Sequence, residues 1–235
     1  MSYSYDYPLA AEAPASTRAT FIRRTYAHLA GAILAFAALE AFLLNAVPMV
    51  EVLGLLAATR YSWLIVLAVF MAVSWIAERW AQSDCSPGLQ YLGLGLYVVA
   101  EAVIFLPLLY LADSLFPDQN LIATAGIMTL TVFGGLTLGV FVTRQDFSGL
   151  RMILAIGSWI LLGVIVAGIL FGFSLGIFFC LAVIALACGY ILFHTSNVLH
   201  HYRTDQHVAA SLALFACVAL LFWYILRFLM LVNRR

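Results

Sequence analysis

This chain contains no lysine, and charged residues of any kind are scarce: 11 arginines and 11 acidic residues make up 9% of its 235 positions. A soluble domain carries roughly a quarter charged residues and roughly half apolar residues, whereas 65% of this chain is apolar. The composition therefore excludes a water-soluble globule. Because the formal net charge is zero, the chain also lacks the basic surface that nucleic-acid binding requires. We expect no nucleic-acid partner.

Most known catalytic and metal-binding motifs are absent as well. The sequence has no phosphate-binding glycine loop, no dinucleotide fingerprint and no paired-histidine metalloprotease motif. Ser158 and His194 are a weak nucleophile–base candidate, because a serine after a glycine is common at helix contacts. Four of the five histidines lie between Phe193 and His207, without the spacing of a zinc site. We expect no enzyme activity, no metal site and no cofactor.

Long apolar runs dominate what is present. A membrane-spanning helix needs about 20 predominantly apolar residues, and the connections between such runs here leave no room for a separate soluble domain. We therefore predict an all-α membrane protein with one seven-helix transmembrane domain over residues 21–235, embedded in a lipid bilayer. The polar residues 1–20 lack the basic start of a secretion signal, and we expect a disordered cytoplasmic tail there. Seven windows meet the length: about 25–47, 61–81, 89–112, 119–143, 151–171, 174–197 and 208–231.

The arginines predict the orientation, because basic residues accumulate on the cytoplasmic side of a membrane. With the N-terminus inside, seven arginines fall on the inner side and four on the outer side, so we expect a cytoplasmic N-terminus. A re-entrant last segment is the alternative, because two of the outer arginines end the chain. The inner set is Arg18, Arg23, Arg24, Arg79, Arg144, Arg151 and Arg203; the outer set is Arg60, Arg227, Arg234 and Arg235.

Three ionisable residues interrupt the apolar runs. Glu40, Glu101 and His194 lie within the first, third and sixth windows. An ionisable side chain at the bilayer centre costs a few kcal/mol, so it normally faces the bundle interior and marks a functional path. We expect the two acids to face inward, as functional groups or as satisfied structural acids. Arg79, at the inner end of the second window, is either a boundary anchor or a partner of these acids. Pro107 is expected to kink or break the third helix.

Several motifs together resemble the Bax inhibitor-1 family, closest to its bacterial inner-membrane branch. The fourth window runs through T-x-x-G-G into V-F-V-T-R-Q-D-F-S-G-L-R at residues 140–151, the sixth ends with I-L-F-H-T-S-N at residues 191–197, and the last begins S-L-A-L-F-A at residues 211–216. The resemblance covers residues 21–232. It implies a bundle in which six helices surround the seventh.

The resemblance also implies a function and a sensor. Several family members are described as calcium-permeable, pH-sensitive leaks, gated by two hydrogen-bonded aspartates on the sixth and seventh helices together with an arginine of the second. In this sequence, His194 and Cys217 stand at the positions of those aspartates. Neither can repeat a carboxylate pair that shares one proton. Acidic charge is instead found at Glu40 and Glu101, with His194 as an expected partner.

Two functions remain open from the sequence. The first is a pH-sensitive cation leak in the bacterial inner membrane, with calcium as the permeant ion and with Glu101, Glu40, His194 and Cys217 along the path or at its gate. The second is a regulator without transport, which binds and restrains a membrane-anchored ATP-dependent protease, as the resemblance implies for bacterial members. A cavity that reaches Glu101 favours the leak, whereas a dry, packed core around it favours the regulator.

Overall fold

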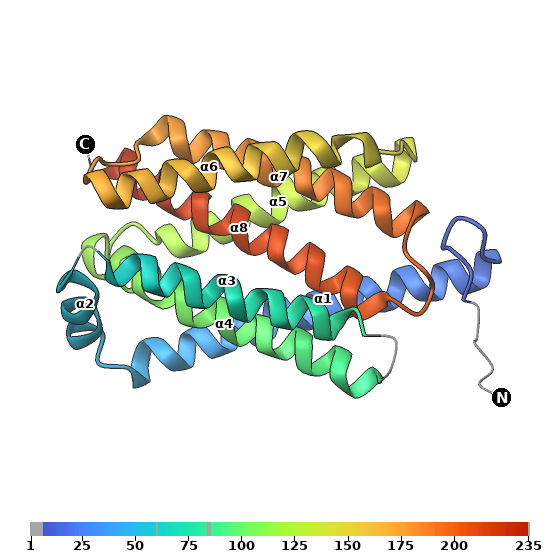
Figure 1. Ribbon diagram of the computed structural model, residues 1–235, viewed down its shortest axis with the longest axis horizontal. Coiled ribbons are helices and arrows are strands. Elements are labelled where there is room, and N and C mark those ends of the chain that lie inside the picture. The colour runs from blue at the N-terminus through green and yellow to red at the C-terminus, as the bar shows by residue number, and fades with distance from the viewer. Residues whose placement is uncertain (1–6, 60, 84–85, 235) are drawn as a thin grey trace.

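The computed structural model describes residues 7–59, 61–83 and 86–234, which form eight α-helices and one short 3-10 helix (Figure 1). Seven of these helices are long and apolar enough to cross a membrane, so the predicted seven-helix membrane fold is confirmed. The elements are α1 (Ala15–Ala46), α2 (Met49–Ala57), α3 (Ser62–Ala81), α4 (Pro87–Leu115), α5 (Leu121–Thr143), η1 (Ser148–Leu150), α6 (Arg151–Phe171), α7 (Ile177–His200) and α8 (His207–Asn233).

The short helix α2 was not predicted from the sequence. Pro48 lacks a backbone N–H and directs the preceding residue towards extended backbone, so α1 ends at Ala46 and a new helix begins after the proline. With nine residues, α2 is too short to span a bilayer and links α1 to α3 at one end of the bundle. Pro107 behaves differently from Pro48. Helix α4 continues from Pro87 to Leu115 with Pro107 inside it, so the prediction that Pro107 breaks this helix is wrong.

Helix α8 lies at the centre of the bundle. Figure 1 shows it crossing obliquely between α5, α6 and α7 on one side and α1, α3 and α4 on the other. It contacts α1, α3, α4, α5 and α7, and side chains such as Leu214, Phe215 and Leu221 are completely or almost completely buried. Helix α6 packs on the outside, against α7 and α3. The expected central position of the last helix is therefore confirmed, with five of the other six long helices in extensive contact with it and α6 outside that layer.

The two ends of the bundle are named here after the chain termini that lie there (Figure 1). At the N-terminal end, residues 7–14 are ordered rather than free. Leu9 pairs with Arg203 in an isolated bridge, and the Ala10 amide donates to the Tyr202 carbonyl over 2.9 Å. Helix α1 already begins at Ala15. The expectation of a disordered tail over residues 1–20 is therefore wrong for residues 7–20, and residues 1–6 lie outside the described residues.

Helices α3 and α4 are in close backbone contact at Gly93. A Cβ atom at this position would lie 2.5 Å from the Ala77 carbonyl oxygen and 2.6 Å from the Ala81 amide nitrogen, both backbone atoms of α3. Small residues permit such close approach of membrane helices. The absence of a side chain at Gly93 therefore fixes the distance between α3 and α4, which together form one wall of the site described below.

We predict that Gly93→Ala separates α3 from α4 and lowers the free energy of unfolding by about 1–3 kcal/mol, the usual cost of overpacking a close contact. Thermal unfolding of the purified protein in detergent, followed by circular dichroism, measures the loss. Gly95→Ala is the matched control, because nothing lies within 4 Å of a Cβ atom at Gly95. Equal midpoints for the two variants would contradict the prediction.

Candidate functional site

A cavity of about 1040 Å³ lies between α3, α4, α6, α7 and α8. It runs along α8 from Ala209, near the N-terminal end, to Arg234, and it is only partly enclosed. Three of the residues predicted from the sequence line it: Glu101, His194 and Cys217. The structure therefore brings together groups from α4, α7 and α8. The first two, Glu101 and His194, are more than 90 positions apart in the chain.

Glu101 lies at the middle of α4 and is only 6% exposed. Its hydrogen-bond partner is the Tyr97 hydroxyl, one helical turn earlier and also buried. The side chain thus faces the bundle interior, as predicted. With this single side-chain partner among the described residues, the carboxylate retains free acceptor positions. It can therefore bind a cation or water that enters the cavity.

His194 faces the same cavity from the C-terminal half of α7, which lies towards the N-terminal end of the bundle (Figure 1). Its ring stacks on Tyr190 at 5.9 Å between centroids with an interplanar angle of 18°, and its Nδ1 has no hydrogen-bond partner among the described residues. Ser158, the weak nucleophile candidate, pairs with the Tyr190 hydroxyl over 2.9 Å. Tyr190 therefore engages Ser158, and no hydrogen bond joins Ser158 to His194 among the described residues, which argues against a serine–histidine pair.

Cys217 is a buried residue of α8, and its Sγ donates to the Ala213 carbonyl oxygen over 3.1 Å. The thiol is therefore satisfied within its own helix. It lines the cavity as a small, weakly polar surface. No hydrogen bond joins Cys217 to His194 among the described residues, so the two side chains do not form a proton-sharing pair in this structure.

Two predicted site residues lie elsewhere. Glu40 is 4% exposed, so it faces inward as expected, but it is not a lining residue of this cavity, and neither of its carboxylate oxygens has a hydrogen-bond partner among the described residues. Arg79 places its guanidinium 5.0 Å from the ring centroid of Trp75, the geometry of a cation–π contact. It is exposed and does not line the cavity. Its neighbour Glu78 lines the cavity instead.

Polar and apolar lining residues separate along the cavity. Its N-terminal half carries Glu78, Tyr97, Glu101 and His194, whereas its C-terminal half is lined mainly by aliphatic and aromatic side chains. Tyr202, in the loop before α8, lines the cavity near its N-terminal end, and burial raises its pKa to about 12, so its hydroxyl stays neutral. The residues of the C-terminal half include Leu108, Leu111, Leu115, Ile165, Ile169, Phe173, Leu220, Trp223, Met230 and Leu231.

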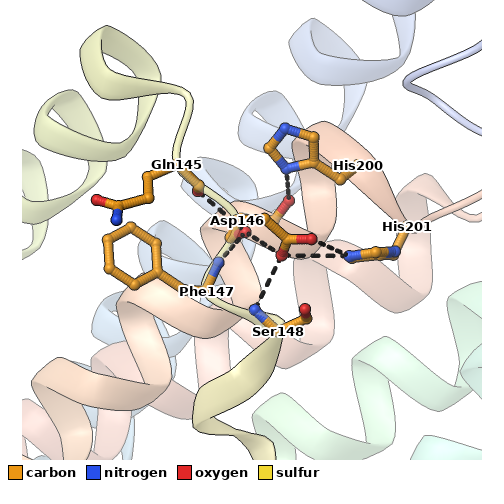
Figure 2. Close-up of polar contacts among 7 residues, drawn as sticks. Gln145, Asp146, Phe147, Ser148, His200 and His201 are labelled. Atoms are coloured by element: carbon orange, nitrogen blue, oxygen red, sulfur yellow. Dashed lines mark hydrogen bonds and ion pairs between the residues drawn. The ribbon is translucent and has the colours of Figure 1, made fainter.

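A second polar cluster, at the N-terminal end of the bundle, was only noted in the sequence as part of the T-R-Q-D-F motif. Figure 2 shows Asp146, in the connection after α5, facing the end of α7. Its Oδ1 accepts the Ser148 amide over 2.9 Å and the Ser196 hydroxyl over 3.3 Å, and its Oδ2 accepts His201 Nε2 over 3.1 Å. The Phe147 amide donates to Ser196 Oγ over 2.9 Å. These bonds fix the α5–α6 connection to α7.

The Ser148 amide, with smaller contributions from the Ser148 and His201 side chains, lowers the pKa of Asp146 from 3.8 to about 2. The stabilisation by these bonds is therefore fully present above the ordinary pKa and is lost only as the pH falls towards 2. Asp146 stays ionised near neutral pH and cannot act as a sensor there. Because Ser196 bonds to Asp146 and not to His201, the cluster also lacks the order of a catalytic triad.

The structure also joins three rings that sequence reasoning did not connect. His28 of α1 and His207 of α8 both place Nε2 near the Tyr91 hydroxyl of α4, at 3.1 and 3.4 Å. His28 Nδ1 lies 2.7 Å from the Arg24 carbonyl oxygen and donates to it. Only the fold brings these helices together, so the sequence carried no signal for the contact. Among the described residues, no group of three or more histidine, cysteine, aspartate or glutamate side chains is arranged to hold a metal ion.

We predict that Asp146→Ala releases the connection between α5 and α6. Amide hydrogen exchange at residues 145–150 should become faster by about tenfold or more, because the Ser148 amide loses its acceptor. Mass spectrometry of the exchanged protein measures the rates. Asp118→Ala, in the connection at the opposite end, is the control and should leave these amides unchanged. An unaltered exchange rate in Asp146→Ala would rule out the anchoring role.

The sequence is similar to a known protein family and to several known proteins. The model of the family described as "Inhibitor of apoptosis-promoting Bax1" matches residues 18–234. Protein lifeguard 4 of Mus musculus is 32% identical over 146 residues, 60% of each chain, so this chain spans less than two thirds of that relative. Protein LIFEGUARD 4 of Arabidopsis thaliana is 27% identical over 222 residues, 92% of this chain and 86% of the relative. An uncharacterized Neisseria meningitidis protein is 26% identical over 175 residues, 72% and 73% of the two chains. No solved structure matches significantly.

Proposed function

Because this multi-pass membrane chain belongs to the Bax inhibitor-1 family, whose model matches residues 18–234, we propose that it is a pH-sensitive cation leak with calcium as the permeant ion. The observation that carries this proposal is the cavity along α8, which Glu101 and His194 line from opposite walls. A cavity beside a buried acid is what a leak requires, whereas a regulator without transport needs no such space. The proposal includes no enzymatic activity.

The acids of the cavity are its proposed cation sites. Carboxylate oxygens are the ligands that calcium prefers, and Glu78 and Glu101 supply them on α3 and α4. Glu78 lies nearer the N-terminal end and is exposed, so a cation meets it before Glu101. His194 and Cys217 border the same space and contribute no fixed negative charge. Glu40 lies outside this path, and its proposed contribution is to gating through the packing of α1.

We predict that Glu101→Gln abolishes a pH-dependent calcium flux. Purified protein in liposomes that enclose a calcium indicator should admit calcium faster at alkaline than at acidic pH, because an ionised carboxylate attracts the cation and glutamine cannot ionise. Flux from pH 6 to pH 8 is the measurement. Glu51→Gln, on the exposed surface of α2, is the matched control.

Three outcomes separate the candidate functions. Loss of flux in Glu101→Gln with normal flux in Glu51→Gln supports the leak and the site together. Equal flux in the wild type and Glu101→Gln contradicts the site. If the wild type shows no flux above empty liposomes at any pH, the leak is wrong, and the alternative of a regulator that binds a membrane-anchored ATP-dependent protease takes its place.

We also propose the inner membrane of a bacterium as the location, with the N-terminus in the cytoplasm. The match to a Neisseria relative supports the first part. The excess of arginines at the N-terminal end of the bundle supports the second, since basic residues favour the cytoplasmic side. The N-terminal half of the cavity would then face the cytoplasm.

This orientation predicts the side of the C-terminus. Because α8 runs through the bundle as a single helix of 27 residues, from the N-terminal end to the C-terminal end, the C-terminus should lie outside the cytoplasm. Alkaline phosphatase fused after Arg235 should be active, and green fluorescent protein fused there should be dark. The reverse pair of signals would invert the orientation or show that α8 does not cross the membrane.

A further inference from the structure

Two arginines near the C-terminal end of α8 line the C-terminal half of the cavity. Arg227 lies within the helix, and Arg234 directly follows the last helical residue, Asn233. Neither forms a salt bridge with a carboxylate among the described residues. Arg227 is half-buried, and a cation inside or at the border of a bilayer is costly unless an anion accompanies it. The C-terminal half thus presents two cations that have no carboxylate partner in the described part of the chain.

The walls beside these arginines are apolar. Leu108 and Leu111 of α4, Ile169 of α6 and Leu220 of α8 line this half. Water is not retained in an apolar space, because it finds too few hydrogen-bond partners there. Within a membrane, a partly open apolar space is filled by the hydrocarbon around it. The whole cavity, at about 1040 Å³, is slightly larger than the roughly 300–1,000 Å³ usual for ligand pockets, so an alkyl chain has room.

From this arrangement we propose that the C-terminal half of the cavity binds one anionic phospholipid of the surrounding bilayer. One acyl chain lies along α8 between α4 and α6, and the phosphate lies at Arg227 and Arg234. A guanidinium binds phosphate oxygens in a bidentate manner, and basic pockets between membrane helices bind anionic headgroups. Ser174, which lines the same end from the α6–α7 connection, offers a further hydroxyl donor.

The lipid site does not depend on ion transport, so the two proposals can fail separately. Bound lipid occupies the apolar half, whereas the acids that we assign to calcium lie in the other half. Charge and shape both select the ligand: a neutral lipid fits the apolar walls but leaves both arginines unpaired, and an inorganic anion pairs with them but leaves the walls empty.

Native mass spectrometry of the full chain, purified in a mild detergent and supplied with phosphatidylglycerol or phosphatidylcholine, tests the proposal. The wild type should retain one phosphatidylglycerol molecule and bind phosphatidylcholine about tenfold more weakly. Arg227→Gln should lower the affinity for phosphatidylglycerol by about tenfold, the loss of one charge-assisted contact. Arg79→Gln, which removes an exposed arginine outside the cavity, should retain the lipid as the wild type does.

A second variant tests the acyl-chain position. Leu220→Trp places a larger side chain on the α8 wall of the C-terminal half and leaves both arginines in place, so it should also reduce lipid retention. Circular dichroism confirms that each variant is folded. The proposal is overturned by equal retention in Arg227→Gln and the wild type, by equal binding of the two lipids, or by retention of a free fatty acid in place of the phospholipid.

Discussion

The cost of placing a charge in hydrocarbon is the constraint on which this structure depends. With only 22 formal charges among 235 residues, most charged side chains lie in the connections or at helix ends, where water is available. Those within the helical bundle face its interior or the cavity along α8: Glu40, Glu101 and Arg227. The cavity is therefore the place where this fold tolerates charge, and any chemistry of ions or headgroups must begin there.

The cavity itself follows from how the helices share α8. Helices α3 and α4 pack closely through Gly93 and hold one wall together. The connection around Asp146 fixes α5 and α6 to the end of α7, so the opposite wall is also anchored at its N-terminal end. Helix α6 packs mainly on α7 and lies outside the layer around α8. The cavity lies beside α8, between the wall formed by α3 and α4 and the wall formed by α6 and α7, and its lining residues come from both walls.

Sequence reasoning succeeded where one physical property decides the outcome. Length and hydropathy identify a membrane span, so all seven were found. It failed where orientation about a helix axis matters: neighbours such as Glu78 and Arg79 differ by about 100° around α3, and the long apolar run gives no periodicity to show which of them faces inward. The structure places Glu78 in the cavity and Arg79 on Trp75. The contacts of residues 7–14 with the loop before α8 were equally out of reach, since they join opposite ends of the sequence.

The distribution of charge along the cavity also constrains the proposed leak. A cation that reaches Glu101 from the N-terminal half meets an apolar section next, and beyond it the positive charges of Arg227 and Arg234. An apolar constriction excludes a hydrated ion, and like charge repels it. Continuous passage therefore requires that the walls formed by α4 and α6 move apart and that an anion neutralises the two arginines. A phospholipid headgroup supplies that anion, while its acyl chain fills the same section. The arrangement fits a slow, regulated leak better than an open pore, with lipid occupancy and wall separation as opposed determinants of the rate.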